Sequence, residues 1–327
     1  MHAAAAISEG TSARDRGLVV LLGVCWGLNW VAVKLALEEV APWTLRCVGM
    51  GLGAATLLAW AWASGRSLRI APGAPRRQLA VAGTLNIAAF GLFTAFAQMA
   101  ATTSRVTIVT YTMPIWSVLF ARWVLGERLD GPRRLAVALA AAGIAVLVAP
   151  LARDGVPPGL WWALAAAVSW AAGTVYLKRA RIGGDPLAIA GWQLVAGFVV
   201  VALGAVLLER GVQPWPALAS TWAALVYHVL LGIALPYLLW FGIVARLPAS
   251  TAALGTLLVP AVAVAGAVLL LAERPTLADA IGFVLVFAAA ATVLMRPAPA
   301  VALASGASTR PRGIVTGERI DERARPR

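Results

Sequence analysis

Ten continuous apolar runs of about 20 residues restrict the fold of this chain more than any other feature of its sequence. A helix of that length crosses the ~30 Å hydrocarbon core of a bilayer, whereas a membrane barrel shows shorter segments of alternating polarity. Lipid offers the backbone no hydrogen bonds, so the sequence predicts an all-α integral membrane protein of about ten transmembrane helices. The expected spans are 17–37, 42–63, 79–100, 104–125, 132–149, 159–178, 187–208, 221–245, 250–271 and 276–295.

The composition agrees with a surface that faces lipid. Hydrophobic residues make up 61% of the chain and charged residues only 13%, whereas about a quarter of a soluble domain is charged.

The short polar connections divide the chain into four parts. We expect an N-terminal tail over 1–16, five-helix repeats over 17–149 and 159–296, and a disordered C-terminal tail over 297–327.

The net charge of +13 reflects membrane orientation and does not indicate binding to nucleic acid. Basic residues gather in loops and tails between the apolar runs. If the N-terminus is cytoplasmic, 21 of the 27 Lys and Arg residues fall in cytoplasmic segments and four in outside loops. Under the positive-inside rule, this distribution predicts that both termini are cytoplasmic.

The two halves of the sequence repeat each other. A Ser-x9-Pro-x12-Glu-Arg pattern occurs twice at an offset of 146 residues, as Ser104, Pro114, Glu127, Arg128 and as Ser250, Pro260, Glu273, Arg274. A second set matches at an offset of 144 residues, with Trp26, Lys34, Pro42 corresponding to Trp170, Lys178, Pro186. Repeats of five spans must be inverted relative to each other, an arrangement typical of transporters whose substrate site lies between the halves.

Pro114 and Pro260 are candidate helix-break or gating positions. A proline within a helix removes one backbone hydrogen bond and crowds the carbonyl four residues earlier, so it bends or opens the helix. Each proline alone is as well explained by a packing kink. Their matched positions in the two repeats favour a functional break.

These motifs resemble the EamA-type permeases of the drug/metabolite transporter superfamily. The resemblance covers both halves and rests on Trp26-Gly27 with Lys34, the two Ser-Pro-Glu-Arg patterns, and Leu238-Leu239-Trp240 followed by Leu247-Pro248-Ala249-Ser250. It implies a ten-helix inverted-repeat carrier of the bacterial inner membrane, often an exporter of amino acids or other metabolites. One departure is Ala272 before Glu273, where the family usually has Gly.

Polar and aromatic side chains within the spans are the candidates for substrate binding. Trp26, Asn29 and Trp30 share one helical face, and an amide between two indoles suits a small amphipathic ligand. Packing between helices is the alternative interpretation, and for His228 so is a neutral ring bonded to a neighbouring carbonyl. The full predicted lining is Trp26, Asn29, Trp30, Asn86, Tyr111, Trp170, Thr174, His228 and Trp240. The first-half residues should face Trp170 and Thr174 across one cavity.

The sequence shows no motif for catalysis, metal binding or nucleotide binding, which reduces the number of possible functions. The acidic residues lie at span ends, in loops or in tails, and no nucleophile–base pair, metal cluster or nucleotide-binding loop can be assembled, so no catalytic residue, metal or cofactor is expected. We therefore expect a secondary transporter that exports a neutral or zwitterionic metabolite by alternating access. An intramembrane enzyme acting on a lipid-linked substrate is the alternative, and a channel is a third option. The bilayer is a partner, and a homodimer is left open.

Overall fold

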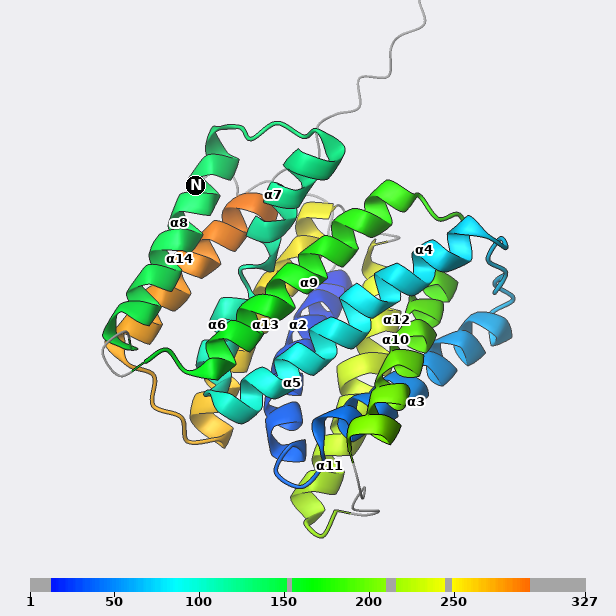
Figure 1. Cartoon of the computed structure of the whole chain (residues 1–327), viewed down its shortest axis with the longest axis horizontal. Coiled ribbons are helices and arrows are strands. Elements are labelled where there is room, and N and C mark those ends of the chain that lie inside the picture. Colours follow the sequence, from blue (N-terminus) through cyan, green and yellow to red (C-terminus); the bar gives the residue numbers. More distant parts are fainter. Residues whose placement is uncertain (1–12, 152–154, 210–215, 245–248, 295–327) are drawn as a thin grey trace, which may run out of the picture. The chain divides into compact units, whose positions relative to one another are not determined.

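The computed structural model describes residues 13–151, 155–209, 216–244 and 249–294, and for 244 and 249–255 the backbone alone (Figure 1). Most of the predicted N-terminal tail and the whole predicted C-terminal tail, 297–327, lie outside the described residues. So do Leu247 and Pro248 of the motif that supports the family resemblance.

Every regular element of the described residues is a helix and none is a strand, which confirms the predicted all-α membrane fold. Nine of its helical segments are long and apolar enough to cross a membrane, and Thr256–Leu270 adds a shorter apolar helix. The first half comprises α2 Ala13–Ala36, α3 Pro42–Ala63, α4 Ala74–Gly83 with η1 Thr84–Ala89 and α5 Phe90–Ala100, α6 Thr103–Thr110 with α7 Met113–Leu125, and α8 Gly131–Val148 with η2 Ala149–Leu151. The second half comprises α9 Pro158–Ala180, α10 Pro186–Leu208, α11 Ala219–Tyr227 with η3 His228–Ala234 and α12 Leu235–Val244, α13 Ala249–Leu270, and α14 Leu277–Leu294.

Local sequence accounts for where several helices begin and end. Proline occupies the first turn of α3, α9 and α10, where its missing N–H leaves no bond unmade. The Asp185 carboxylate accepts from the backbone N–H groups of Leu187 and Ala188 at the start of α10. Gly126 ends α7 with a φ of 71°, a left-handed conformation that glycine adopts without strain.

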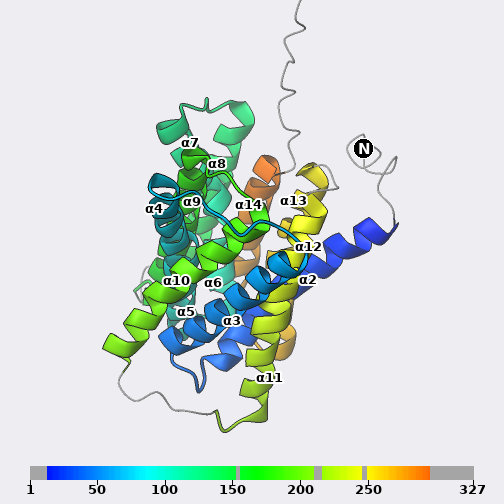
Figure 2. The same cartoon turned by 90° about the vertical axis from the view of Figure 1, so that its right-hand side faces the viewer.

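The two halves interleave, because the most extensive helix contacts join one half to the other. Helix α14 packs on α8, α10 on α3, α13 on α2, and α9 on α5 (Figures 1 and 2). Gly143 and Gly282 allow α8 and α14 to approach closely, since a Cβ on Gly143 would lie 3.0 Å from the Gly282 carbonyl oxygen. Such pairing agrees with a two-repeat architecture.

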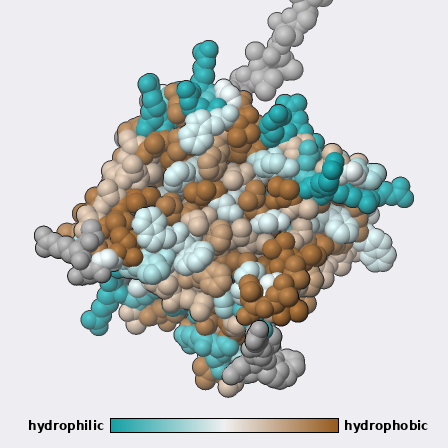
Figure 3. Space-filling model, viewed as in Figure 1, coloured by the Kyte–Doolittle hydropathy of each residue, from teal (hydrophilic) through white to brown (hydrophobic). Residues whose placement is uncertain are grey.

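Large apolar side chains lie on the outside of the helices. Trp62, Val206 and Leu269 are 74%, 80% and 79% exposed. On the face shown in Figure 3, apolar and weakly polar residues cover the middle and hydrophilic side chains project at its margins. A soluble protein would rarely expose so much apolar surface, so this surface is the one that contacts lipid.

The two predicted helix breaks differ. Helices α6 and α7 are separate, with Tyr111 and Thr112 between them and Pro114 in the first turn of α7. The Thr112 hydroxyl donates to the Val109 carbonyl oxygen at 2.7 Å, so this oxygen has a hydrogen-bond donor at the break. Pro260, in contrast, lies within the continuous helix α13. The repeat therefore conserves the proline but not the interruption, and a gating role for either proline stays a prediction.

The third span of each half contains a π-helical segment that periodicity did not predict. These segments are η1 in the first half and η3 in the second. A π-helical turn inserts a residue into the helix, rotates the side chains on either side, and is frequent at functional sites. Asn86 lies in η1 and His228 in η3, so both irregular segments carry a residue of the predicted lining.

Candidate functional site

A hydrogen bond between Asn29 and His228 joins α2 to η3. The Asn29 Oδ1 atom and the His228 Nδ1 atom are 2.8 Å apart. An amide oxygen only accepts, so the Nδ1 atom donates and the neutral ring presents a lone pair at Nε2. Asn29 also packs on Gly232, where an added Cβ would clash with the amide oxygen. Two residues of the predicted lining are thus direct partners.

A second asparagine joins η1 to α9 and α10. The Thr174 hydroxyl donates to Asn86 Oδ1, and Asn86 Nδ2 donates to Gln193 Oε1, each over 3.4 Å. Asn86 packs on Gly173 of α9, where an added Cβ would clash with Oδ1. The structure therefore brings Asn86 and Thr174 together as neighbours, with Gln193 as a partner that sequence reasoning missed.

These two contacts are copies of each other under the internal repeat. Asn29 corresponds to Gly173 at an offset of 144 residues, and Asn86 corresponds to Gly232 at an offset of 146. In each copy, an asparagine from the first half packs on a glycine of the second half. We call Asn29, Gly232, Asn86 and Gly173 the paired-asparagine layer. It is a polar contact between the halves, within the spans, at equivalent positions of the inverted fold.

Aromatic rings from three spans surround the α2 side of this layer. Trp26 contacts Tyr237 and Trp240 of α12, with ring centroids 6.3 and 5.9 Å away. Trp30 contacts the buried Tyr111 at the α6–α7 break, at a centroid distance of 6.4 Å. Trp26 and Trp240 of the predicted lining are therefore ring neighbours, and their binding of a substrate stays a prediction. Tyr237 was missed, although it lies next to Pro236 in the same predicted span as Trp240.

Trp170 is half-buried on α9. The rings described next to Trp26 belong to α12, not to α9. That Trp26 and Trp170 line one cavity therefore stays a prediction. The same holds for substrate binding by the other residues of the predicted lining.

Charged and polar residues outside the predicted lining lie between α2, α3 and α5. Lys34 donates to the Gln98 carbonyl oxygen, and Gln98 Nε2 donates to the Trp30 carbonyl oxygen at 3.0 Å. Arg46, buried on α3, donates to Gly91 and Thr94 of α5. Both cations stand alone in apolar runs, and this isolation is the signal that could have identified them.

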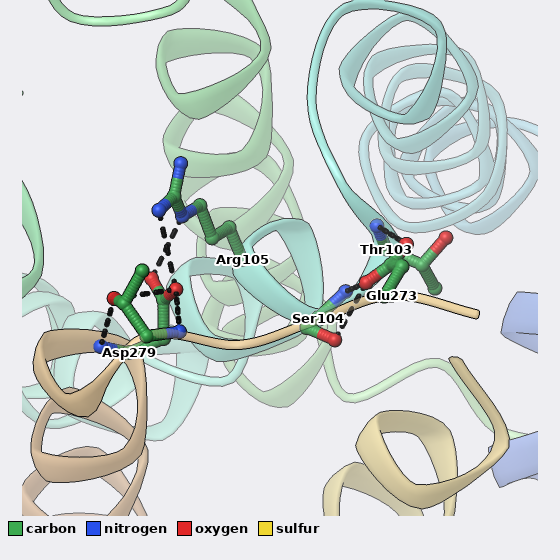
Figure 4. Close-up of polar contacts among 6 residues, drawn as sticks. Thr103, Ser104, Arg105, Glu273 and Asp279 are labelled. Carbon is green, nitrogen blue, oxygen red and sulfur yellow. Dashed lines mark hydrogen bonds and ion pairs between the residues drawn. The ribbon is translucent and has the colours of Figure 1, made fainter. Parts of the chain in front are cut away.

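At one end of the bundle, Glu273 of the second half binds the start of α6, which belongs to the first half. Its carboxylate accepts from the backbone N–H groups of Thr103 and Ser104 at 2.6 and 2.9 Å and from the Ser104 hydroxyl at 2.6 Å (Figure 4). A carboxylate there satisfies the free N–H groups of a helix N-terminus and interacts favourably with the helix dipole. We call this set of contacts the Glu273 latch.

A second ion pair lies beside the Glu273 latch. The Arg105 guanidinium donates from two nitrogens to the Asp279 carboxylate, over 2.7 and 3.1 Å (Figure 4). Asp279 is 3% exposed, and it also accepts from the backbone N–H and hydroxyl of Thr276. A bidentate, buried pair of this kind fixes geometry as well as charge, so it holds α6 and α14 together at this end.

The repeat copy of Glu273 has different partners at the opposite end. Glu127 accepts from Lys178 at 2.7 Å and from Arg133 at 3.3 Å. Lys178 corresponds to Lys34 in the repeat, yet Lys34 donates to a carbonyl rather than to Glu273. Equivalent residues thus make different bonds at the two ends, and in this respect the structure departs from the symmetry of its sequence.

Two further carboxylates cap helices at the Glu273 end. Glu209 accepts from the backbone N–H groups of Trp43 and Thr44 and from the Thr44 hydroxyl at the start of α3. Glu39 accepts from Thr221 and from two backbone N–H groups before α11. The hydrogen bond from Thr221 is the main reason why the pKa of Glu39 is lowered. This cap therefore weakens as the pH falls and the carboxylate is protonated.

A cleft opens at the same end, next to the Glu273 latch. Its volume is about 680 Å³, and its charged lining residues are Lys34, Glu38 and Glu273. Deeper in the bundle, Tyr111 and Pro260 line a void of only about 10 Å³. Pro260 thus packs close to the α6–α7 break at Tyr111, and the void beside them is too small for a solute.

Comparison with known proteins settles the family. The sequence model described as the EamA-like transporter family matches residues 17–149 and again residues 157–295. The chain belongs to this family. It is a membrane transporter of the drug/metabolite transporter superfamily, and the double match agrees with the two-repeat architecture of the fold.

Individual relatives agree with this assignment at low identity. A protein of Escherichia coli (strain K12) named "Probable amino-acid metabolite efflux pump" is 25% identical over 84% of this chain and 93% of its own length. The "Uncharacterized transporter YvbV" of Bacillus subtilis (strain 168) is 27% identical over 82% of this chain and 88% of its own length. A solved crystal structure, 27% identical in sequence, superposes with a TM-score of 0.58 over 84% of this chain and 95% of its own.

The described residues contain no group of three His, Cys, Asp or Glu side chains that could hold a metal ion. The two cysteines, Cys25 and Cys47, are free thiols.

Proposed function

We propose that this transporter exports a small neutral or zwitterionic metabolite, such as an amino acid, across a bacterial inner membrane by alternating access. Membership of the family indicates a transport function, and the names of relatives suggest the class of solute. The paired-asparagine layer and the rings around Trp26, Trp30 and Tyr111 supply polar groups and apolar walls between the halves. Trp170 and the other residues of the predicted lining belong to the same proposal.

The observation that carries the mechanism is the different bonding of the repeat copies Glu273 and Glu127. Both contacts join the two halves, but Glu273 caps the start of α6 at one end of the bundle, whereas Glu127 forms an ion pair with Lys178 at the other. In an inverted repeat, exchanging the bonding patterns of the two ends produces the opposite conformation. In that conformation Glu273 would leave Ser104 and turn to Lys34, which lines the same cleft.

The charge pattern assigns the two ends to the two sides of the membrane. The Glu127 end carries the basic loops around Arg66, Arg77 and Arg128. Under the positive-inside rule it faces the cytoplasm, and the Glu273 latch closes the outside. In this proposal, release of the Glu273 latch is the step that opens the exit to the outside.

Flux through reconstituted protein tests this function. Vesicles are loaded with an isotope-labelled extract of small cell metabolites, and the solutes that leave are identified, with protein-free vesicles as the control. We expect saturable efflux of an amino acid or a similar solute, accelerated by the same unlabelled solute on the far side. Efflux that rises linearly with concentration would indicate a channel. Conversion of lipid-linked material without efflux would indicate an enzyme.

A further inference from the structure

Arg46 is a buried cation that bonds to neutral groups. It is 7% exposed on α3, and its Nε and Nη2 atoms donate to the Gly91 carbonyl at 2.8 Å and the Thr94 hydroxyl at 3.0 Å. The ion pairs described in this chain involve other basic residues, namely Arg66, Arg105, Arg133 and Lys178. An ionised side chain in a membrane span is costly and faces a partner or a substrate pathway, so this cation requires an explanation.

A buried acceptor lies next to this cation. His228 Nε2 packs against α3 at Gly49, one turn after Arg46, where an added Cβ would lie 2.5 Å away. A ligand can therefore reach this atom only when α3 and η3 move apart. His228 is 3% exposed, and its Nε2 atom has no described hydrogen-bond partner. Because Nδ1 donates to Asn29, Nε2 presents a lone pair. A buried acceptor without a donor costs free energy until a donor arrives.

We propose that Arg46 and His228 together recognise the head group of an α-amino acid. The carboxylate would bind the guanidinium of Arg46, and the ammonium group would donate to Nε2 of His228. A dicarboxylate or a phosphate fits less well, since its second anionic group would meet the lone pair. Asn29 holds the ring in the tautomer that accepts, and is therefore a positioning residue. This proposal rests on the proposed function and adds the groups that select the solute.

Binding to the purified full-length chain tests the chemistry of recognition. The twenty proteinogenic L-amino acids are screened for their effect on the melting temperature, and affinities come from its dependence on concentration. The amino acid that stabilises most is then measured again as its methyl ester, which lacks the anion, and as its N-acetyl derivative, which lacks the ammonium group. We expect each modification to weaken binding at least about tenfold, because it leaves a buried group unpaired.

Variants connect this chemistry to the two residues. Arg46→Gln should weaken binding of the free amino acid at least about tenfold and leave binding of the methyl ester unchanged, because the ester has no carboxylate to lose. Arg179→Gln removes an exposed arginine from the end of α9 and is the matched control. If Arg46→Gln does not fold, Arg46→Lys keeps the charge and should discriminate against the ester less than the wild type does.

Equal affinity for the free amino acid and its ester would overturn the proposal. So would unchanged binding of the free amino acid by Arg46→Gln, or the absence of binding by all twenty amino acids. If vesicles then showed saturable flux of a different solute, the carrier function would still hold. Only the amino-acid head-group site would be refuted.

Discussion

Linking position 104 to position 273 should stop transport, and breaking the link should restore it. In a background with Cys25→Ala and Cys47→Ala, Ser104→Cys and Glu273→Cys place thiols on both sides of the Glu273 latch. Since cysteine is shorter than glutamate, a short bifunctional thiosulfonate bridges the pair through two reducible disulfides. Locking the start of α6 to the segment between α13 and α14 blocks the opening step, so we expect flux to fall at least about tenfold.

Three controls make this result specific. Each single cysteine variant should lose little flux on treatment with the reagent. Thr44→Cys with Glu209→Cys bridges a cap of the same geometry between α3 and α10, which pack on each other, and should retain at least about half of the flux. A membrane-impermeant reductant outside intact cells should reverse the 104–273 link, because we assign this end to the outside. Full flux through the linked protein would contradict a moving latch.

Gly232→Ala should destabilise the protein strongly, and Asn29→Ala should relieve much of that damage. A Cβ at Gly232 clashes with the Asn29 amide oxygen, and over-packing a tight contact costs about 1–3 kcal/mol. Shortening Asn29 makes room for the methyl group, so the double variant should be more stable than the sum of the single effects predicts. The coupling, measured from unfolding midpoints in detergent, should also be about 1–3 kcal/mol.

The repeat supplies a second copy of this experiment. Gly173→Ala with Asn86→Ala should show coupling of the same sign, since Asn86 packs on Gly173 in the same way. Gly131→Ala is the matched control, because an added Cβ there meets no atom within 4 Å. If the single and double variants proved additive at both sites, the paired-asparagine layer would have no structural role.

The sequence was sufficient to predict the fold because membrane helices are determined by local composition. Runs of about 20 apolar residues predict the spans without knowledge of their neighbours, and the Ser-Pro-Glu pattern revealed the repeat. The break next to Pro114 followed from the missing N–H of proline. The uninterrupted helix around Pro260 did not follow, because packing decides whether a proline bends a helix or interrupts it.

The contacts of the candidate site depended on how helices pack against each other, which periodicity does not encode. Asn29 and His228 were each predicted to line a cavity, but their mutual hydrogen bond depends on how α2 packs on η3. Ser104 and Glu127 occur in one motif, yet Ser104 binds the Glu273 of the other repeat. Arg46 was passed over because it lies near a span end, where a basic residue is usually exposed to water.

The distance between Thr102 and Ala272 tests the central claim of an alternating carrier most directly. Both residues are exposed and line the cleft beside the Glu273 latch, so spin labels there report whether this end opens. In lipid nanodiscs we predict two distance populations, a short one with the latch formed and a long one with it broken. Glu273→Gln, which removes the charge that caps α6, should enlarge the long population. A single short distance in wild type and in Glu273→Gln alike, while vesicles of the same protein still transport solute, would contradict the account.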